Sequence, residues 1–174
     1  MATNQRRPFG DRLIPALLDR LIDEDPMQRS EAESSRAMNR TQYRQAVLRD
    51  LRWLFNAVNA SSEIDFDGYP DAAKSVINFG LPPLAGQRLS ELDWPLMEEM
   101  MREAIRVFEP RVLPESIEVR AIRSTNPLDH HNLLAFEIKG QLWAEPYPLE
   151  LLLRSQIDLE SGTVSVVDNA AMVS

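Results

Sequence analysis

Apolar residues recur at the spacing of an α-helix in three parts of the chain. Residues 11–24 form a short amphipathic stretch, residues 41–58 a longer one, and residues 96–108 separate apolar from charged side chains most cleanly. Positions three and four apart share one face of a helix, so each stretch predicts a helix with one buried face. A further short helix is expected around residues 71–77, where a turn sequence with two prolines follows.

The helix predicted over residues 41–58 has a core face and an exposed tryptophan. Its core-facing residues are Tyr43, Val47, Leu51, Leu54 and Val58, with Leu48 and Phe55 at the margin. At about 100° per residue, Trp53 falls on the opposite side, next to Arg49. Exposed tryptophans often anchor protein interfaces, so Trp53 is a candidate partner-binding residue. The alternative is that the helix over residues 11–24 folds over it.

After residue 115 the apolar period changes from that of a helix to that of a strand. Alternating apolar residues predict strands over 117–121, 134–142 and 149–159, and a turn at 160–162 leads into a short strand over 163–167. Helices first and strands later are typical of an α+β fold, with helices packed on one face of a small, mostly antiparallel sheet. The last strand is a candidate sheet edge that could pair with a strand of another chain.

The length of 174 residues fits one compact domain with an appended segment. Residues 27–40 are polar and rich in serine, arginine and glutamate, which is typical of a linker. We therefore divide the chain into residues 1–40, a tethered N-terminal amphipathic helix with its polar linker, and residues 41–174, a single α+β domain.

Charge and composition exclude several classes of function. The net charge is −8, and residues 61–174 alone carry −10, which argues against binding nucleic acid through its phosphates. No apolar run approaches the length of a membrane helix, so we expect a cytoplasmic protein without membrane insertion. The chain has no cysteine, and the adjacent pair His130 and His131 cannot complete a metal site alone. Motifs for nucleotide binding and hydrolysis are also absent, so we expect no cofactor, no metal and no enzymatic activity.

The most informative short motif is Glu109-Pro110-Arg111, at the end of the helix predicted over 96–108. Pro110 cannot continue a helix and favours extended geometry at Glu109, so Glu109 and Arg111 would point the same way as a charged fork. The fork could contact a partner. Alternatively, the two residues pair with each other, or Arg111 complements the negative end of the helix dipole. Glu109 is also the best candidate acid for a glycoside hydrolase, which we keep as an alternative.

Several short strings in the same order resemble a known family. They are Phe9-Gly10, Leu17-Leu18-Asp19-Arg20-Leu21, Asp50-Leu51, Leu54-Phe55-Asn56, Ser75-Val76-Ile77-Asn78-Phe79-Gly80-Leu81-Pro82 and Phe108-Glu109-Pro110-Arg111. Together they resemble the small baseplate-wedge subunit of the type VI secretion system, the TssE family, which is similar to the small wedge protein of contractile phage tails.

The resemblance implies a structural role without catalysis. A family member would bind the wedge proteins TssF, TssG and TssK and lie under the first sheath ring of TssB and TssC, at the baseplate docked on the inner-membrane complex. It implies that Glu109, Pro110 and Arg111 hold the core bundle of the wedge, so Arg111→Ala is expected to spare the fold and weaken partner binding. Alternatives are a lysozyme-like peptidoglycan hydrolase, or the equivalent subunit of a phage-tail-like particle.

Overall fold

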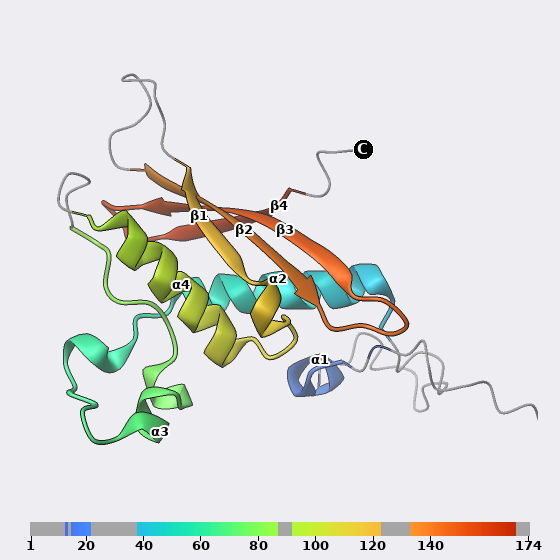
Figure 1. The fold of residues 1–174 in the computed structure, drawn as a ribbon, viewed down its shortest axis with the longest axis horizontal. Helices are drawn as coiled ribbons and strands as arrows, with labels where there is room; N and C mark the ends of the chain where they lie inside the picture. The colour runs from blue at the N-terminus through green and yellow to red at the C-terminus, as the bar shows by residue number, and fades with distance from the viewer. Residues whose placement is uncertain (1–12, 14, 22–37, 87–91, 123–132, 170–174) are drawn as a thin grey trace, which may run out of the picture.

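The computed structural model describes residues 13, 15–21, 38–86, 92–122 and 133–169. A twisted sheet forms one layer, and the two long helices lie together against one of its faces (Figure 1). The helices are α1 (Leu17–Leu21), α2 (Arg40–Asn56), α3 (Pro70–Ala73) and α4 (Trp94–Phe108), with single 3₁₀ turns at Ala60–Ser62, Val76–Asn78 and Pro114–Ser116. The strands are β1 (Glu118–Ile122), β2 (Leu133–Leu142), β3 (Leu149–Asp158) and β4 (Val164–Asp168).

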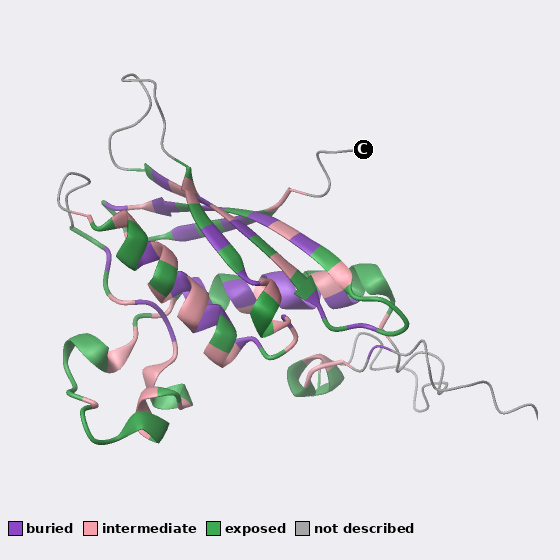
Figure 2. Ribbon diagram, viewed as in Figure 1, coloured by how far each residue is buried: buried purple, intermediate pink, exposed green. Residues whose placement is uncertain are grey.

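The four strands follow one another in the order β1-β2-β3-β4, and every neighbouring pair is antiparallel. Alternate residues of β2 and β3 are buried, so one face of the sheet packs on the helices while the other faces solvent (Figure 2). The predicted α+β fold is therefore confirmed. β4 is an edge strand, as predicted, and β1 forms the opposite edge.

Helix α2 begins one residue earlier and ends two residues earlier than the sequence predicts. The side chain of Asn39 accepts a hydrogen bond from Gln42 N, and the Gln42 side chain accepts one from Asn39 N, which caps two of the free amides of the first turn. The helix ends at Asn56, and Ala57 is extended. The prediction that Val58 belongs to the core face is consequently wrong: its side chain is 65% exposed because it lies beyond the helix.

Helix α4 begins at a capped turn and ends where Pro110 requires it to end. Asp93 accepts a hydrogen bond from Leu96 N, and Pro95 occupies the first turn, where no amide partner is needed. The last helical residue is Phe108 and the cap is Glu109, as predicted from the proline.

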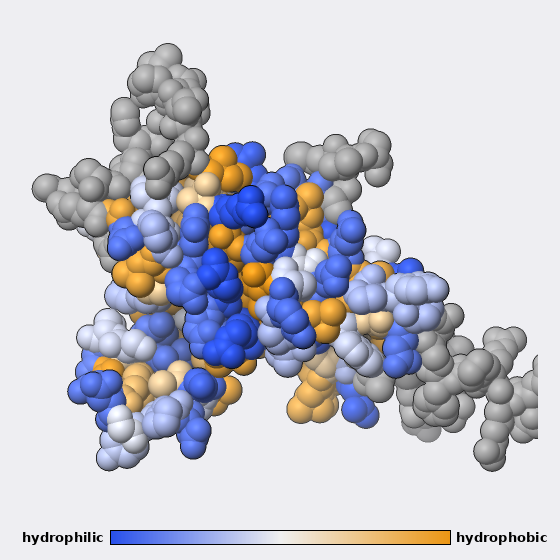
Figure 3. Space-filling view, in the orientation of Figure 1, coloured by the Kyte–Doolittle hydropathy of each residue, from blue (hydrophilic) through white to orange (hydrophobic). Residues whose placement is uncertain are grey.

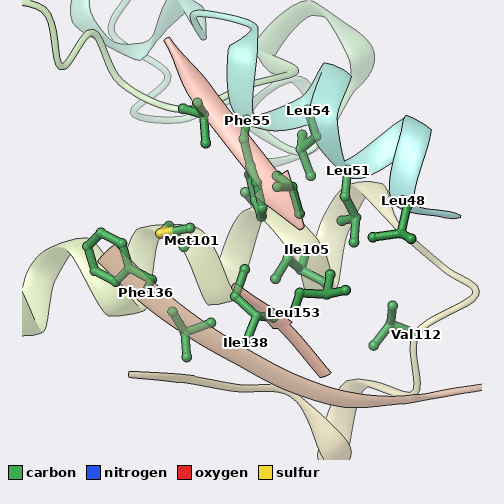
Figure 4. Packing of buried hydrophobic residues seen from close by; sticks show 14 of the residues in the cluster. Leu48, Leu51, Leu54, Phe55, Met101, Ile105, Val112, Phe136, Ile138 and Leu153 are labelled. Atoms are coloured by element: carbon green, nitrogen blue, oxygen red, sulfur yellow. The ribbon is translucent and has the colours of Figure 1, made fainter. Parts of the chain in front are cut away.

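The core lies between the sheet and the pair α2 and α4. Its fully buried members include Val47, Leu51 and Leu54 of α2, Met101 and Ile105 of α4, and Leu134, Phe136, Ile138, Leu153 and Ile157 of the sheet. Figure 4 shows Leu51 and Leu54 of α2, Met101 and Ile105 of α4, and Phe136, Ile138 and Leu153 of the sheet. Trp94 packs on Phe136 with ring centroids 6.1 Å apart.

Polar side chains of the helices bond to the outer edges of the sheet. At β4, the Asn56 amide accepts from Val164 N at 2.9 Å and donates to Val164 O at 2.8 Å, and Arg52 donates to Val166 O at 3.0 and 3.1 Å. At β1, Glu98 of α4 accepts from Ala121 N at 2.7 Å. Both edge strands therefore have part of their outward backbone occupied.

Residues 57–86 form an irregular extension below α4 (Figure 1). The short helix predicted around 71–77 is split into α3 and the 3₁₀ turn Val76–Asn78. Gly80 has φ +124°, and a Cβ there would lie 2.3 Å from Ala57 O. Only glycine fits this close approach, which lets Leu81 N donate to Ala57 O at 2.9 Å.

The N-terminal helix is shorter in the described residues than the predicted 11–24, and residues 22–24 lie outside them, as does most of the predicted linker. Before α1, Leu13 is buried and pairs with Met38 as an isolated antiparallel bridge. The division between residues 1–40 and 41–174 stays a prediction. Among the described residues, no helix combines the length and apolar character needed to cross a lipid bilayer.

Candidate partner-binding site

The two charged residues of the Glu109-Pro110-Arg111 motif pair with each other. Arg111 Nε donates to Glu109 Oε1 at 2.6 Å, and Arg111 NH2 donates to Glu109 Oε2 at 2.5 Å. The backbone N of Arg111 also donates to Oε1 at 3.2 Å. Glu109 is only 3% exposed, whereas Pro110 is exposed. Of the alternatives left open by the spacing, the internal pair is the one observed.

Arg111 also contacts helix α2, which sequence spacing did not suggest. Its NH2 group donates to Asp50 Oδ2 at 2.5 Å, joining two positions that are 61 residues apart. One guanidinium thus bridges a carboxylate at the end of α4 and a carboxylate on α2. The Asp50-Leu51 string was noted only as part of the family resemblance, and no spacing rule links it to Arg111.

The ion-pair network continues from Asp50 to the N-terminal helix. Arg49 Nε donates to Asp50 Oδ1 at 2.8 Å, and Arg49 NH1 donates to Asp19 Oδ1 of α1. The guanidinium carbon of Arg49 lies 5.0 Å from the centre of the Trp53 ring, a cation–π contact. We call Asp19, Arg49, Asp50, Glu109 and Arg111 the charged cluster.

Burial and charge oppose each other at Arg111. Burial alone would lower the pKa of Arg111, but the hydrogen bonds and charges of Glu109 and then Asp50 outweigh it and raise that pKa above its usual value. The hydrogen bond that Arg49 donates to Asp19 is the main cause that raises the pKa of Arg49. Both guanidinium groups are therefore held charged, and the acidic members of the cluster outnumber the basic ones by one.

Tyr43 connects the same region to the hairpin between β2 and β3. Its hydroxyl donates to Trp143 O at 3.1 Å, and Trp143 N donates to Arg111 O at 2.8 Å. Burial raises the pKa of Tyr43, an effect that the charge of Arg111 opposes and that of Glu109 reinforces. The end of α4, the middle of α2 and the start of the hairpin are thus joined by polar contacts.

The structure brings Glu109 and Arg111 together and places Trp53 at the other end of the charged cluster. Trp53 is 51% exposed, so α1 does not cover it, and its predicted position opposite the core face is confirmed. Whether Glu109, Pro110, Arg111 and Trp53 bind a partner stays a prediction.

The described part of the chain has no group of three or more histidine or acidic residues placed to hold a metal ion. His130 and His131 lie outside the described residues.

Fold and site together define a small α+β protein in which the charged cluster ties α1, α2 and the end of α4 to one another and the exposed Trp53 lies beside it. The comparison with protein families matches residues 41–147 to the family described as baseplate wedge protein gp25. The match spans more than half of the chain, and the chain belongs to this family of structural baseplate-wedge proteins. No curated protein and no solved structure matches the chain.

Proposed function

We propose that this protein is the small baseplate-wedge subunit of a type VI secretion system. It binds TssF, TssG and TssK in the cytoplasm, at the baseplate docked on the inner-membrane complex, and helps to start assembly of the TssB and TssC sheath. The family match carries the proposal, because its range of residues 41–147 contains Asp50, Trp53 and the whole Glu109-Pro110-Arg111 motif. A structural family fits a protein that binds and does not catalyse.

The charged cluster supplies a rigid surface for this role. Glu109 and Asp50 hold Arg111 from two sides, so the exposed Pro110 and the accessible fifth of the Arg111 side chain are presented in one geometry. Arg111 NH1 is buried and has no hydrogen-bond acceptor in the described residues, so the accessible part of this side chain lies elsewhere on it. A preorganised contact costs less ordering on binding than a mobile one.

Trp53 is the residue with which to test wedge binding, because it is half exposed and its removal leaves the core intact. We expect Trp53→Ala to weaken co-purification with TssF and TssG by about 30-fold, the effect of losing a hot-spot side chain. The matched control is Tyr147→Ala, another exposed aromatic residue, which lies on the β2–β3 hairpin. If the wild-type chain does not co-purify with these subunits, the proposed function is wrong.

Sheath initiation has its own test in cells. In a strain that lacks this gene, we expect no fluorescent sheath of labelled TssB, and we expect the wild-type gene to restore it. Sheaths that still form at normal frequency without the gene would exclude a role in initiation. The equivalent subunit of a phage-tail-like particle would use the same contacts with other partners, and the genes beside this one distinguish the two.

Peptidoglycan cleavage with Glu109 as the acid is the alternative activity. A general acid must reach a substrate oxygen within hydrogen-bond distance. Both oxygens of Glu109 accept from Arg111, and the side chain is 4% exposed, so Glu109 would first have to leave its partner. These contacts favour a structural role for Glu109. We expect the purified protein to leave peptidoglycan intact, and cleavage that disappears in Glu109→Gln would contradict this.

A further inference from the structure

Helix α1 lies on the body with its polar side inward and its leucines outward. Leu17 and Leu21 are 70% and 72% exposed and Leu18 is 41% exposed, whereas the Asp19 side chain is only 6% exposed. Figure 3 shows apolar surface at the lower edge of the molecule, where Figure 1 places α1. An amphipathic helix normally buries its apolar stripe, so α1 is docked in the reverse orientation.

The contact that holds α1 in this orientation is incompletely satisfied. Asp19 Oδ1 accepts from Arg49 NH1, but Asp19 Oδ2 is buried without a hydrogen-bond partner. Arg49 NH2 is also buried without one, although it lies 2.8 Å from Asp50 Oδ1. Buried charges stabilise a contact only when their hydrogen-bonding groups are used, so this ion pair is a weak attachment.

The other attachment in the described residues lies before the helix, where Leu13 is buried and belongs to the hydrophobic core. The helix has five residues and none of them is classed as buried, and the nearest backbone contact is Met38 N donating to Leu13 O at 3.1 Å. A helix this short is marginal in water without packing of an apolar face. Within α1 itself, Asp19 is the residue whose side chain is tied to the domain by an ion pair in the described part of the chain.

We propose that α1 is an internal, displaceable occupant of Arg49, and that Arg49 together with the neighbouring exposed Trp53 receives a helix of a neighbouring wedge subunit that presents a carboxylate. The present occupant shows the chemistry required at Arg49, which is a carboxylate carried by a helix. Arg49 NH2 lies 2.8 Å from Asp50 Oδ1, so a partner carboxylate would bond to Arg49 NH1 in place of Asp19. The partner helix would lie against the exposed Trp53 ring, and the released leucines of α1 would become available for burial elsewhere in the wedge.

This inference rests on the proposed function. The test is whether releasing α1 makes the protein bind its wedge partner more tightly or more weakly. If α1 competes with a partner helix, then weakening the attachment of α1 raises the fraction of molecules whose Arg49 is free to bind the partner. Binding of the partner then becomes tighter. We expect full-length Asp19→Asn to bind the purified TssF–TssG complex about tenfold more tightly than wild type, and Arg49→Gln to bind much more weakly. Hydrogen exchange of the Leu13–Leu21 segment should be faster in Asp19→Asn, which shows that α1 has been released.

Asp71→Asn is the matched control, because it removes the same charge from an exposed position on α3 and should leave both readouts unchanged. Weaker binding by Asp19→Asn would mean that docked α1 is itself part of the interface, and this would overturn the proposal. Unchanged binding together with faster exchange would also overturn it, because α1 would then not compete. If wild type and all variants fail to bind TssF–TssG, it is the proposed function that fails.

Discussion

Replacing Arg111 with alanine should destabilise the protein, because two carboxylates depend on its guanidinium. Glu109 would keep only the backbone amide of residue 111, at 3.2 Å, and would stay buried. Asp50 would keep Arg49, whose Nε lies 2.8 Å away, and its side chain is 24% exposed. Most of the lost stability therefore comes from the unpaired carboxylate of Glu109.

The expected cost is about 3 kcal/mol, at the lower end of the range of about 3–5 kcal/mol for breaking a buried ion pair. The lower end applies because Arg111 is 19% exposed and Asp50 retains a cation. With a urea slope of about 2 kcal/mol per molar, the unfolding midpoint should fall by about 1.5 M. Adding Glu109→Gln to Arg111→Ala should recover about 1 kcal/mol, because a neutral amide replaces the unpaired carboxylate.

Urea unfolding followed by circular dichroism measures this directly. Arg106→Ala is the matched control, because the ion pair of Arg106 with Glu103 is exposed on both sides and should contribute less than about 1 kcal/mol. Equal midpoints for Arg111→Ala and Arg106→Ala would refute the reasoning. The family resemblance implies that Arg111→Ala spares the fold, whereas the pair of Arg111 with the buried Glu109 predicts a loss of stability. Partner binding by Arg111→Ala must therefore be corrected for its unfolded fraction.

Four further substitutions test other parts of the structure by urea or thermal unfolding. Asn39→Ala should cost about 1 kcal/mol through loss of the α2 cap, and no change would mean that the cap does not form in solution. Gly80→Ala should cost about 2–3 kcal/mol, because its Cβ meets Ala57 O at a backbone angle that alanine rarely adopts. Ser155→Ala should cost less than about 0.5 kcal/mol, because the buried hydroxyl has no partner to lose. Burial raises the pKa of the Tyr43 hydroxyl, so the stability that this hydroxyl contributes is complete below about pH 10. That contribution is lost as the pH rises through the folded-state pKa of Tyr43. Tyr43→Phe should therefore lose less stability than wild type above about pH 10.

Local patterns predicted the elements well where one physical cause dominated. Pro110 ends α4 because it cannot donate a hydrogen bond, and this was evident from the sequence. The same holds for the strands, whose apolar alternation matches the buried face of the sheet. The spacing of Val58 fits the core face of the helix, but the helix ends at Asn56, so Val58 lies beyond it and is exposed.

The candidate site was only half predictable. The pairing of Glu109 with Arg111 is local, so spacing alone could suggest it as one alternative. The bridge from Arg111 to Asp50 depends on how α2 packs against the end of α4, which is a tertiary property. The inward orientation of Asp19 was missed for a different reason, because the apolar periodicity of α1 predicts that its leucines face the core.

The side chains that bond to β4 determine how a strand of another chain could join the sheet. Val164 already has both backbone groups bonded to Asn56, and Val166 O is bonded to Arg52. At these three backbone groups an incoming strand would have to replace an existing bond, so it would gain few hydrogen bonds there. Pairing would then be driven by other contacts of the incoming chain. Unassembled copies would have little tendency to join edge to edge, and a strand would be accepted only from a neighbour that is already docked.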